Sequence, residues 1–122
     1  MSEKNVQLSV PAEAEFARSV RMMASTLAVC CDMSVDDVED VRMIAEEGFV
    51  YACATAPASV DVAFALSGAG MAMDFTLGEE EPEDASIDLV EVLLGAVCDV
   101  FQISEDGRCL HLEKRAGAPD DE

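Results

Sequence analysis

An apolar run from residue 48 to residue 54 constrains the fold more than any other part of this sequence. It forms the second half of a helix that we expect to begin after a capping box at Ser34 and Asp37 and to end near Thr55, before Pro57. The first half of this helix keeps its apolar residues to one face, whereas residues 48–54 are apolar nearly all round. In a soluble protein such a helix has contacts on both sides. The sequence therefore predicts a central helix enclosed by other elements.

Shorter periodic segments surround this helix. A period of two residues is typical of strands, and a recurrence every three or four residues is typical of helices. Turn signals separate the strands, with two glycines in the loop 67–70 and an Asp-Gly pair at Asp106 and Gly107. On this basis we predict strands over residues 6–10, 60–66, 71–77, 100–104 and 109–113, and two further helices over residues 12–31 and from a Ser86 cap to near Asp99.

Three helices are too few to cover both faces of a five-stranded sheet, so we expect them to cover one face. The predicted fold class is an α/β (α+β) two-layer sandwich, in which a mixed, mostly antiparallel sheet of about five strands carries three helices on one face. Residues 1–115 are expected to form a single domain, because a chain of this length buries one core. Residues 116–122 are expected to form a flexible acidic tail.

Two helix faces can be assigned from the spacing of apolar residues. The face of the first helix that we expect to pack on the sheet consists of Phe16, Val20, Met23 and Leu27. The third helix has one face that is shared by Leu89, Leu93, Ala96 and Val97. The five cysteines lie in apolar segments without C-x-x-C spacing, and we expect them to be reduced and buried.

The net charge of the chain limits the classes of molecule that it can bind. It has 26 acidic and 7 basic residues, a net charge of −19, and nucleic-acid phosphates repel such a surface. No binding to nucleic acid is therefore expected, and the acidic excess serves either solubility or attraction to a basic protein surface. No apolar run approaches the roughly 20 residues that span a bilayer, and the polar residues 1–5 do not resemble a signal peptide. We expect a cytoplasmic protein without membrane contact.

Several segments resemble the anti-sigma-factor serine kinases, a branch of the histidine-kinase-like (Bergerat) ATPases. Residues 38–47 are similar to the helix that opens the N-box of this family, and residues 8–13 to its first strand and turn. Residues 97–100 resemble the end of its last helix, and residues 110–114 its terminal strand. The similarity covers nearly the whole chain in matching order, and it implies the fold of this ATPase family.

The resemblance also implies roles for individual residues. In the family, an N-box Glu is the base toward a protein serine, and an Asn four residues later holds the magnesium that bridges the ATP phosphates. Glu47 matches this Glu, but Tyr51 stands at the Asn position; counting from Glu46 places Val50 there. A tyrosine hydroxyl is a poor magnesium ligand. We expect Tyr51 and its apolar neighbours to fill the nucleotide space, with Tyr51 buried against the third helix or the segment 79–86.

The other nucleotide motifs of the family are also reduced here. Of the D-x-G-x-G motif after the third strand only Gly78 is left, so Tyr51 and Gly78 are the degenerate positions of the nucleotide site. The glycine-rich phosphate loop is replaced by residues 79–86, which have no glycine and five carboxylates in their first six positions. These charges would repel a triphosphate, so we expect neither ATP nor magnesium as a cofactor and no resident metal. His111, the one histidine, is expected at the surface rather than in catalysis.

The resemblance leaves several functions open. The first is a non-catalytic regulatory module of the partner-switching type, a pseudo-ATPase that holds a sigma factor or an anti-anti-sigma-like domain by surface contact. The alternative is an ATP-dependent serine kinase acting on an anti-anti-sigma factor, with Glu47 as its base. A third is a sensor in which the former nucleotide pocket takes another small molecule. The resemblance further implies a homodimer formed through the first-strand side of the sheet.

Overall fold

The strands and helices follow one another in the order that the periodicities predict. The computed structural model describes residues 4–82 and 85–116. Its helices are α1 (Ala17–Cys30), which follows a 3-10 turn (Ala14–Phe16), α2 (Val35–Ala54) and α3 (Ala85–Val97). Its strands are β1 (Lys4–Pro11), β2 (Ser59–Ser67), β3 (Gly70–Thr76), β4 (Val100–Ile103) and β5 (Cys109–Arg115). Apart from Ala116, the expected tail over residues 116–122 lies outside the described residues.

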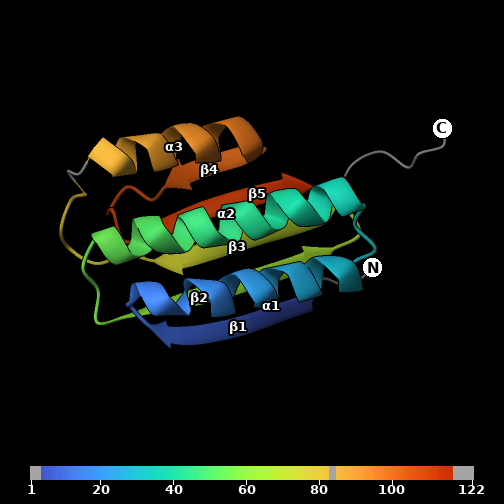
Figure 1. Ribbon diagram of the computed structural model, residues 1–122, viewed down its shortest axis with the longest axis horizontal. Helices are drawn as coiled ribbons and strands as arrows, with labels where there is room; N and C mark the ends of the chain where they lie inside the picture. The colour runs from blue at the N-terminus through green and yellow to red at the C-terminus, as the bar shows by residue number, and fades with distance from the viewer. Residues whose placement is uncertain (1–3, 83–84, 117–122) are drawn as a thin grey trace.

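The five strands form one sheet in the order β1-β2-β3-β5-β4, and every neighbouring pair is antiparallel. Figure 1 shows α1, α2 and α3 side by side in one layer in front of this sheet. The α+β two-layer sandwich is thereby confirmed. The sheet is antiparallel throughout rather than mixed, because β5 lies between β3 and β4, the two strands that α3 connects in the same direction.

The central helix α2 has the enclosed second half that its sequence predicts. It begins as expected, because the backbone N–H of Asp37 donates to the Ser34 hydroxyl at 3.1 Å. Within residues 48–54, Val50 is the one exposed side chain. The fully or nearly buried residues there are Gly48, Phe49, Tyr51 and Ala52.

Gly48 brings α2 close to the sheet. A Cβ at this position would lie 2.7 Å from Cε1 of Phe75 on β3 and 3.0 Å from Cδ1 of Leu112 on β5. Both side chains are completely buried. The glycine therefore sets the distance between the helix layer and the sheet at the middle of the core.

The first helix turns the predicted face toward the core, but the centre of that face is shifted by one residue. Val20, Ala24 and Ala28 are completely buried, and Phe16, Met23 and Leu27 pack beside them with part of their surface exposed. The two alanines allow α1 to lie close against α2, its main neighbour. Larger residues at the centre of the face would hold the two helices apart.

The face of the third helix that the spacing predicts is its outer face. Among the residues of α3 whose burial is described, Ile87, Val90 and Leu94 are buried, whereas Leu89 is 59% exposed and Ala96 is exposed as well. The spacing did not decide the orientation, because apolar residues occupy every side of α3 except the one with Asp88, Glu91 and Gly95, so that two faces satisfy the helical period. The helix begins at Ala85, which places the expected N-cap Ser86 inside it.

The cysteines are free thiols, but they are not buried as expected. Cys30 is exposed and the other four are partly exposed. Cys30 is the last residue of α1 and lies about 200° around the helix from Ala28, so it faces away from the buried face.

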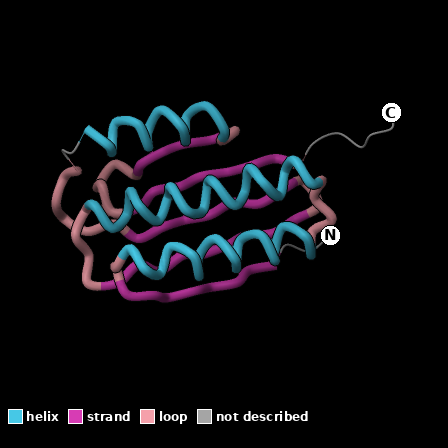
Figure 2. The backbone as a smooth tube through the Cα atoms, viewed as in Figure 1, coloured by secondary structure: helices cyan, strands magenta, loops and turns pink. Residues whose placement is uncertain are grey.

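Three connections gather at one end of the sandwich. Figure 2 shows the loop after α2, the segment after β3 and the β4–β5 hairpin together at the left of the view. The segments come from distant parts of the sequence, and their grouping positions the cleft described below.

We predict that alanine substitutions at two helical glycines change the free energy of unfolding in opposite directions. Gly48→Ala should lower the free energy of unfolding by about 1–3 kcal/mol, because the new methyl group overpacks against Phe75 and Leu112. Gly95→Ala in α3 should raise it by about 0.5–1 kcal/mol, since its Cβ meets only Phe101 at 3.9 Å and alanine favours a helix. Urea unfolding of both variants measures this. Stabilisation by both substitutions would show that α2 does not lie this close to the sheet.

Candidate functional site

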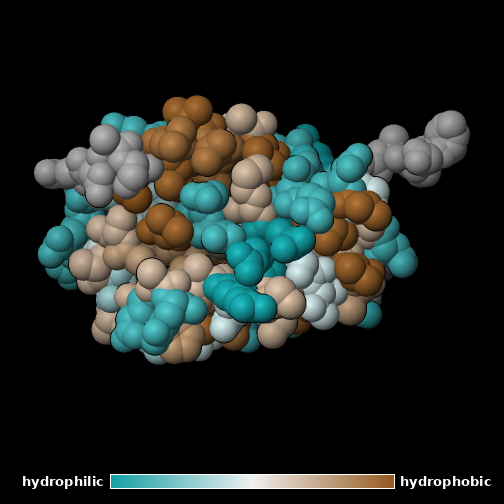
Figure 3. All heavy atoms as spheres, in the orientation of Figure 1, coloured by the Kyte–Doolittle hydropathy of each residue, from teal (hydrophilic) through white to brown (hydrophobic). Residues whose placement is uncertain are grey.

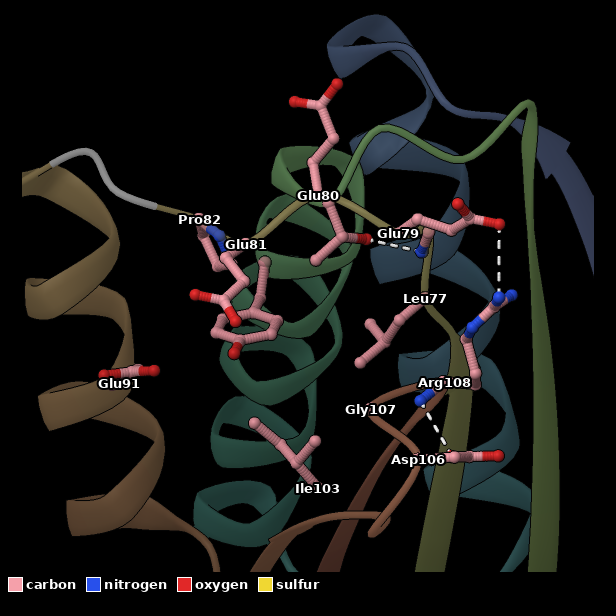
Figure 4. Close-up of a pocket in the computed structure, with 13 residues that line it drawn as sticks. Leu77, Glu79, Glu80, Glu81, Pro82, Glu91, Ile103, Asp106, Gly107 and Arg108 are labelled. Atoms are coloured by element: carbon pink, nitrogen blue, oxygen red, sulfur yellow. Dashed lines mark hydrogen bonds and ion pairs between the residues drawn. The ribbon is translucent and has the colours of Figure 1, made fainter.

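A cleft of about 520 Å³ opens where the C-terminal end of α2 meets the segment after β3, the β4–β5 hairpin and α3 (Figure 4). Its walls include both positions that the family resemblance assigned to a degenerate nucleotide site, Tyr51 and Gly78. The full lining is formed by Tyr51, Thr55, Leu77, Gly78, Glu79, Glu80, Glu81, Pro82, Glu91, Ile103, Asp106, Gly107 and Arg108.

Carboxylates dominate the charge of this cleft. Five of the lining residues are acidic, and Arg108 is the one basic residue among them. Arg108 Nη2 pairs with Glu79 Oε2 at 3.1 Å, and its backbone N–H donates to Asp106 Oδ1 at 3.0 Å, so this one cation is shared among five carboxylates (Figure 4). Glu91 projects toward the cleft from α3. The cleft therefore favours positive charge and disfavours anions.

Thr55 connects the end of α2 to the floor of the cleft. Its buried hydroxyl donates to the Ala52 carbonyl at 2.6 Å and accepts the N–H of Gly78 at 2.7 Å. Its own carbonyl accepts the N–H of Glu80 at 3.1 Å. A Cβ at Gly78 would lie 2.2 Å from this carbonyl oxygen. Gly78 is thus required by the close approach of two backbones.

Tyr51 lies in the cleft wall and is 5% exposed. Burial raises the pKa of its hydroxyl, and the charge of Glu91 and the hydrogen bond to that carboxylate on α3 raise the pKa further. The expected burial of Tyr51 is confirmed. The cleft is open beside the ring. That Tyr51 and its apolar neighbours fill the nucleotide space stays a prediction.

Glu47 lies one turn before Tyr51 on α2 and is not among the residues that line the cleft. Burial raises the pKa of its carboxyl, and the adjacent charge of Glu46 raises the pKa further. Glu46 itself pairs with Arg21 of α1 at 3.1 Å. The two neighbouring carboxylates therefore have different surroundings, and the structure does not bring Glu47 to the same cavity as Tyr51 and Gly78.

His111 lies on the face of the sheet that no helix covers. Its Nδ1 is 2.6 Å from Asp74 Oδ1 on β3, and its Nε2 is 2.7 Å from Glu113 Oε2 on β5. It is more enclosed than the surface imidazole that we expected, because strand pairing places Asp74 directly beside it. Among the described residues, no group of three or more histidine, cysteine, aspartate and glutamate side chains is arranged to hold a metal.

Sequence reasoning missed several residues of the cleft. The sequence predicted only that a helix ends near Thr55, and it assigned no role to Glu91. The signal available for Thr55 is its position one residue after the end of α2, where a hydroxyl often binds helix carbonyls. Nothing local indicates that Glu91 and Arg108 meet at one cavity, since they come from α3 and a hairpin.

With this geometry established, comparison with known proteins identifies the fold. No family model matches the sequence, and no curated protein matches it. A solved structure described as the RsbU and RsbW domains of Rv1364c from Mycobacterium tuberculosis superimposes with a TM-score of 0.75 over 95% of this chain, at 18% identity. The chain has the fold of part of that protein. It spans 33% of the length of the solved chain.

Along residues 4–82 and 85–116, no helix combines the length and the apolar character needed to cross a membrane.

The role of Thr55 can be tested with two substitutions. Thr55→Val keeps the shape but removes the hydroxyl, so the N–H of Gly78 loses its acceptor, and the free energy of unfolding should fall by about 1–3 kcal/mol. Thr55→Ser keeps the hydroxyl and should cost less. Hydrogen exchange of the Gly78 and Glu80 amides should accelerate in the valine variant. Equal losses in the two variants would assign the effect to packing instead.

His111 should make stability depend on pH near neutrality. Burial lowers the pKa of the His111 imidazole, but the hydrogen bonds to Glu113 and Asp74 and the charges of these carboxylates raise it more. The pKa in the folded state is therefore above the usual histidine value of 6.5. The stabilisation is complete below the unfolded pKa and is lost as pH rises through the higher folded pKa. The stability difference between wild type and His111→Gln should therefore shrink with rising pH in urea unfolding. A constant difference would show that the imidazolium is not preferentially stabilised in the fold.

Proposed function

We propose that this chain is a non-catalytic regulatory module of the partner-switching type, which holds a protein partner by surface contact. The partner class is a sigma factor or an anti-anti-sigma-like domain, as the family resemblance implies. The fold that the chain shares with a structure containing an RsbW domain supports a regulatory, protein-binding role.

The observation that carries the non-catalytic part is the acidic lining of the cleft. A magnesium–triphosphate complex needs donors for the phosphate oxygens, but five carboxylates and one paired guanidinium surround this space. The N–H of Gly78 already donates to Thr55, and the charge of Glu91 raises the pKa of the Tyr51 hydroxyl, so neither group is free to bind a phosphate oxygen. The residues present therefore do not fit ATP with magnesium.

The kinase alternative rests on Glu47. Its partly buried carboxyl has a raised pKa, as a general base near neutrality requires. The sensor alternative rests on the open cleft, whose volume is within the range of small-ligand sites. Both alternatives predict that a small molecule enters the cleft, whereas the proposed module acts through its surface.

Nucleotide binding separates these functions by thermal unfolding. We expect the melting temperature in millimolar ATP with magnesium to equal that in magnesium alone, because the cleft lacks groups that bind a triphosphate. A ligand at about 100 times its dissociation constant adds about 2.7 kcal/mol, which raises the melting temperature of a domain of this size by several degrees. Magnesium alone is the necessary control, because it separates an effect of the cation on the acidic surface from an effect of the nucleotide.

A shift that requires both ATP and magnesium would overturn the non-catalytic proposal. The kinase alternative then predicts transfer of phosphate from ATP to a serine of an anti-anti-sigma protein, and Glu47→Gln should abolish this transfer while leaving the thermal shift in place.

A further inference from the structure

The outward face of α3 carries a continuous apolar stripe. Leu89 is 59% exposed and Val92 is 66% exposed, Ala96 is exposed, and Leu93 is partly exposed. Spacings of three and four residues place these side chains on one side of the helix. Figure 3 shows the corresponding hydrophobic patch over α3, at the top of the view. We call Leu89, Val92, Leu93 and Ala96 the outer stripe.

A helix at the surface of a soluble protein normally turns polar residues to water, whereas the polar residues Asp88 and Glu91 of α3 occupy only one of its sides. The inner face of α3 is already packed, since Ile87, Val90 and Leu94 are buried against the rest of the chain. The outer stripe faces water, although adjacent exposed apolar groups of this kind mark interaction surfaces. The described part of the chain supplies nothing to cover it.

The acidic residues near the outer stripe indicate which kind of surface would cover the stripe. Asp88 lies on α3 one turn before Val92 of the outer stripe, Glu91 lies further around the helix at the cleft, and Glu79, Glu80 and Glu81 precede the helix. From residue 43 to residue 107 the chain has no lysine, arginine or histidine. A second copy of the chain would bring like charges together at this face, on top of a net charge of −19 for each copy. A basic partner surface gains from the same charges.

We propose that the outer stripe of α3 is a docking face for a basic amphipathic helix of the partner protein. The apolar side of that helix covers Leu89, Val92 and Leu93, and its lysine or arginine residues lie against Asp88 and the acidic residues that precede α3. This inference rests on the proposed function, because it names the kind of surface that the protein partner presents. Helix-in-groove recognition of this type uses apolar anchors at helical spacing.

The test uses the full chain and a synthetic peptide of about 18 residues, roughly five helical turns, with leucines on one face and lysines elsewhere. Fluorescence anisotropy measures its affinity at about 0.15 M salt, where distant charges are largely screened. Each of two control peptides keeps only one of the two properties, the apolar face or the positive charge. One replaces the lysines by glutamate, and the other replaces the leucines by glutamine.

Matched double variants locate the binding. Leu89→Gln with Val92→Gln removes the centre of the outer stripe, and Met22→Gln with Val29→Gln removes side chains of α1 that are 49% and 63% exposed. Neither pair changes the net charge. We expect the first pair to weaken the leucine-lysine peptide by about tenfold or more and the second by less than about twofold. Unfolding curves of both variants confirm that each is folded.

Three outcomes would overturn the docking face. Equal affinity for the glutamine-lysine peptide would show that charge alone attracts the probe, and equal loss in the two double variants would show that the site is elsewhere. A wild-type dimer that the Leu89→Gln, Val92→Gln pair converts to a monomer would make the outer stripe a self-interface. Sedimentation measures the last point.

The peptide test and the nucleotide test can fail independently of each other. If neither the peptide nor ATP with magnesium binds, the docking face is rejected and the non-catalytic proposal stands. If ATP with magnesium binds while the first double variant still loses the peptide, the docking face stands and the non-catalytic proposal is rejected.

Discussion

The close contact of α2 with the sheet at Gly48 is the constraint on which the rest of the structure depends. The glycine lets the helix backbone approach Phe75 and Leu112, two completely buried side chains of neighbouring strands. Because α2 lies this close to the sheet, α1 and α3 pack on either side of it in the same layer (Figure 1). The enclosed half of α2 is the direct result, and the cleft lies at its C-terminal end.

Local signals predict the elements of this fold better than their arrangement. The capping box and Pro57 delimit α2, and glycine-containing turns separate β2 from β3 and β4 from β5. The insertion of β5 between β3 and β4 has no local signature, because strand order depends on contacts between distant segments. The inner face of α3 was equally undetermined, since apolar residues occupy every side of that helix except the one with Asp88, Glu91 and Gly95.

The candidate site shows the same division. Its two sequence-assigned positions, Tyr51 and Gly78, do lie in one cleft, but Glu47 does not line it. The structure adds a physical reason for Gly78 that is independent of any nucleotide, because the Thr55 carbonyl leaves no room for a Cβ there. Glycine at this position is therefore compatible with the fold alone and is not by itself a sign of phosphate binding.

Glu91 links the two surfaces to which functions are assigned here. Its carboxylate lines the cleft and its charge raises the pKa of Tyr51 on α2, while the same helix carries the outer stripe on the side away from the cleft. Both surfaces therefore depend on how α3 packs against α2.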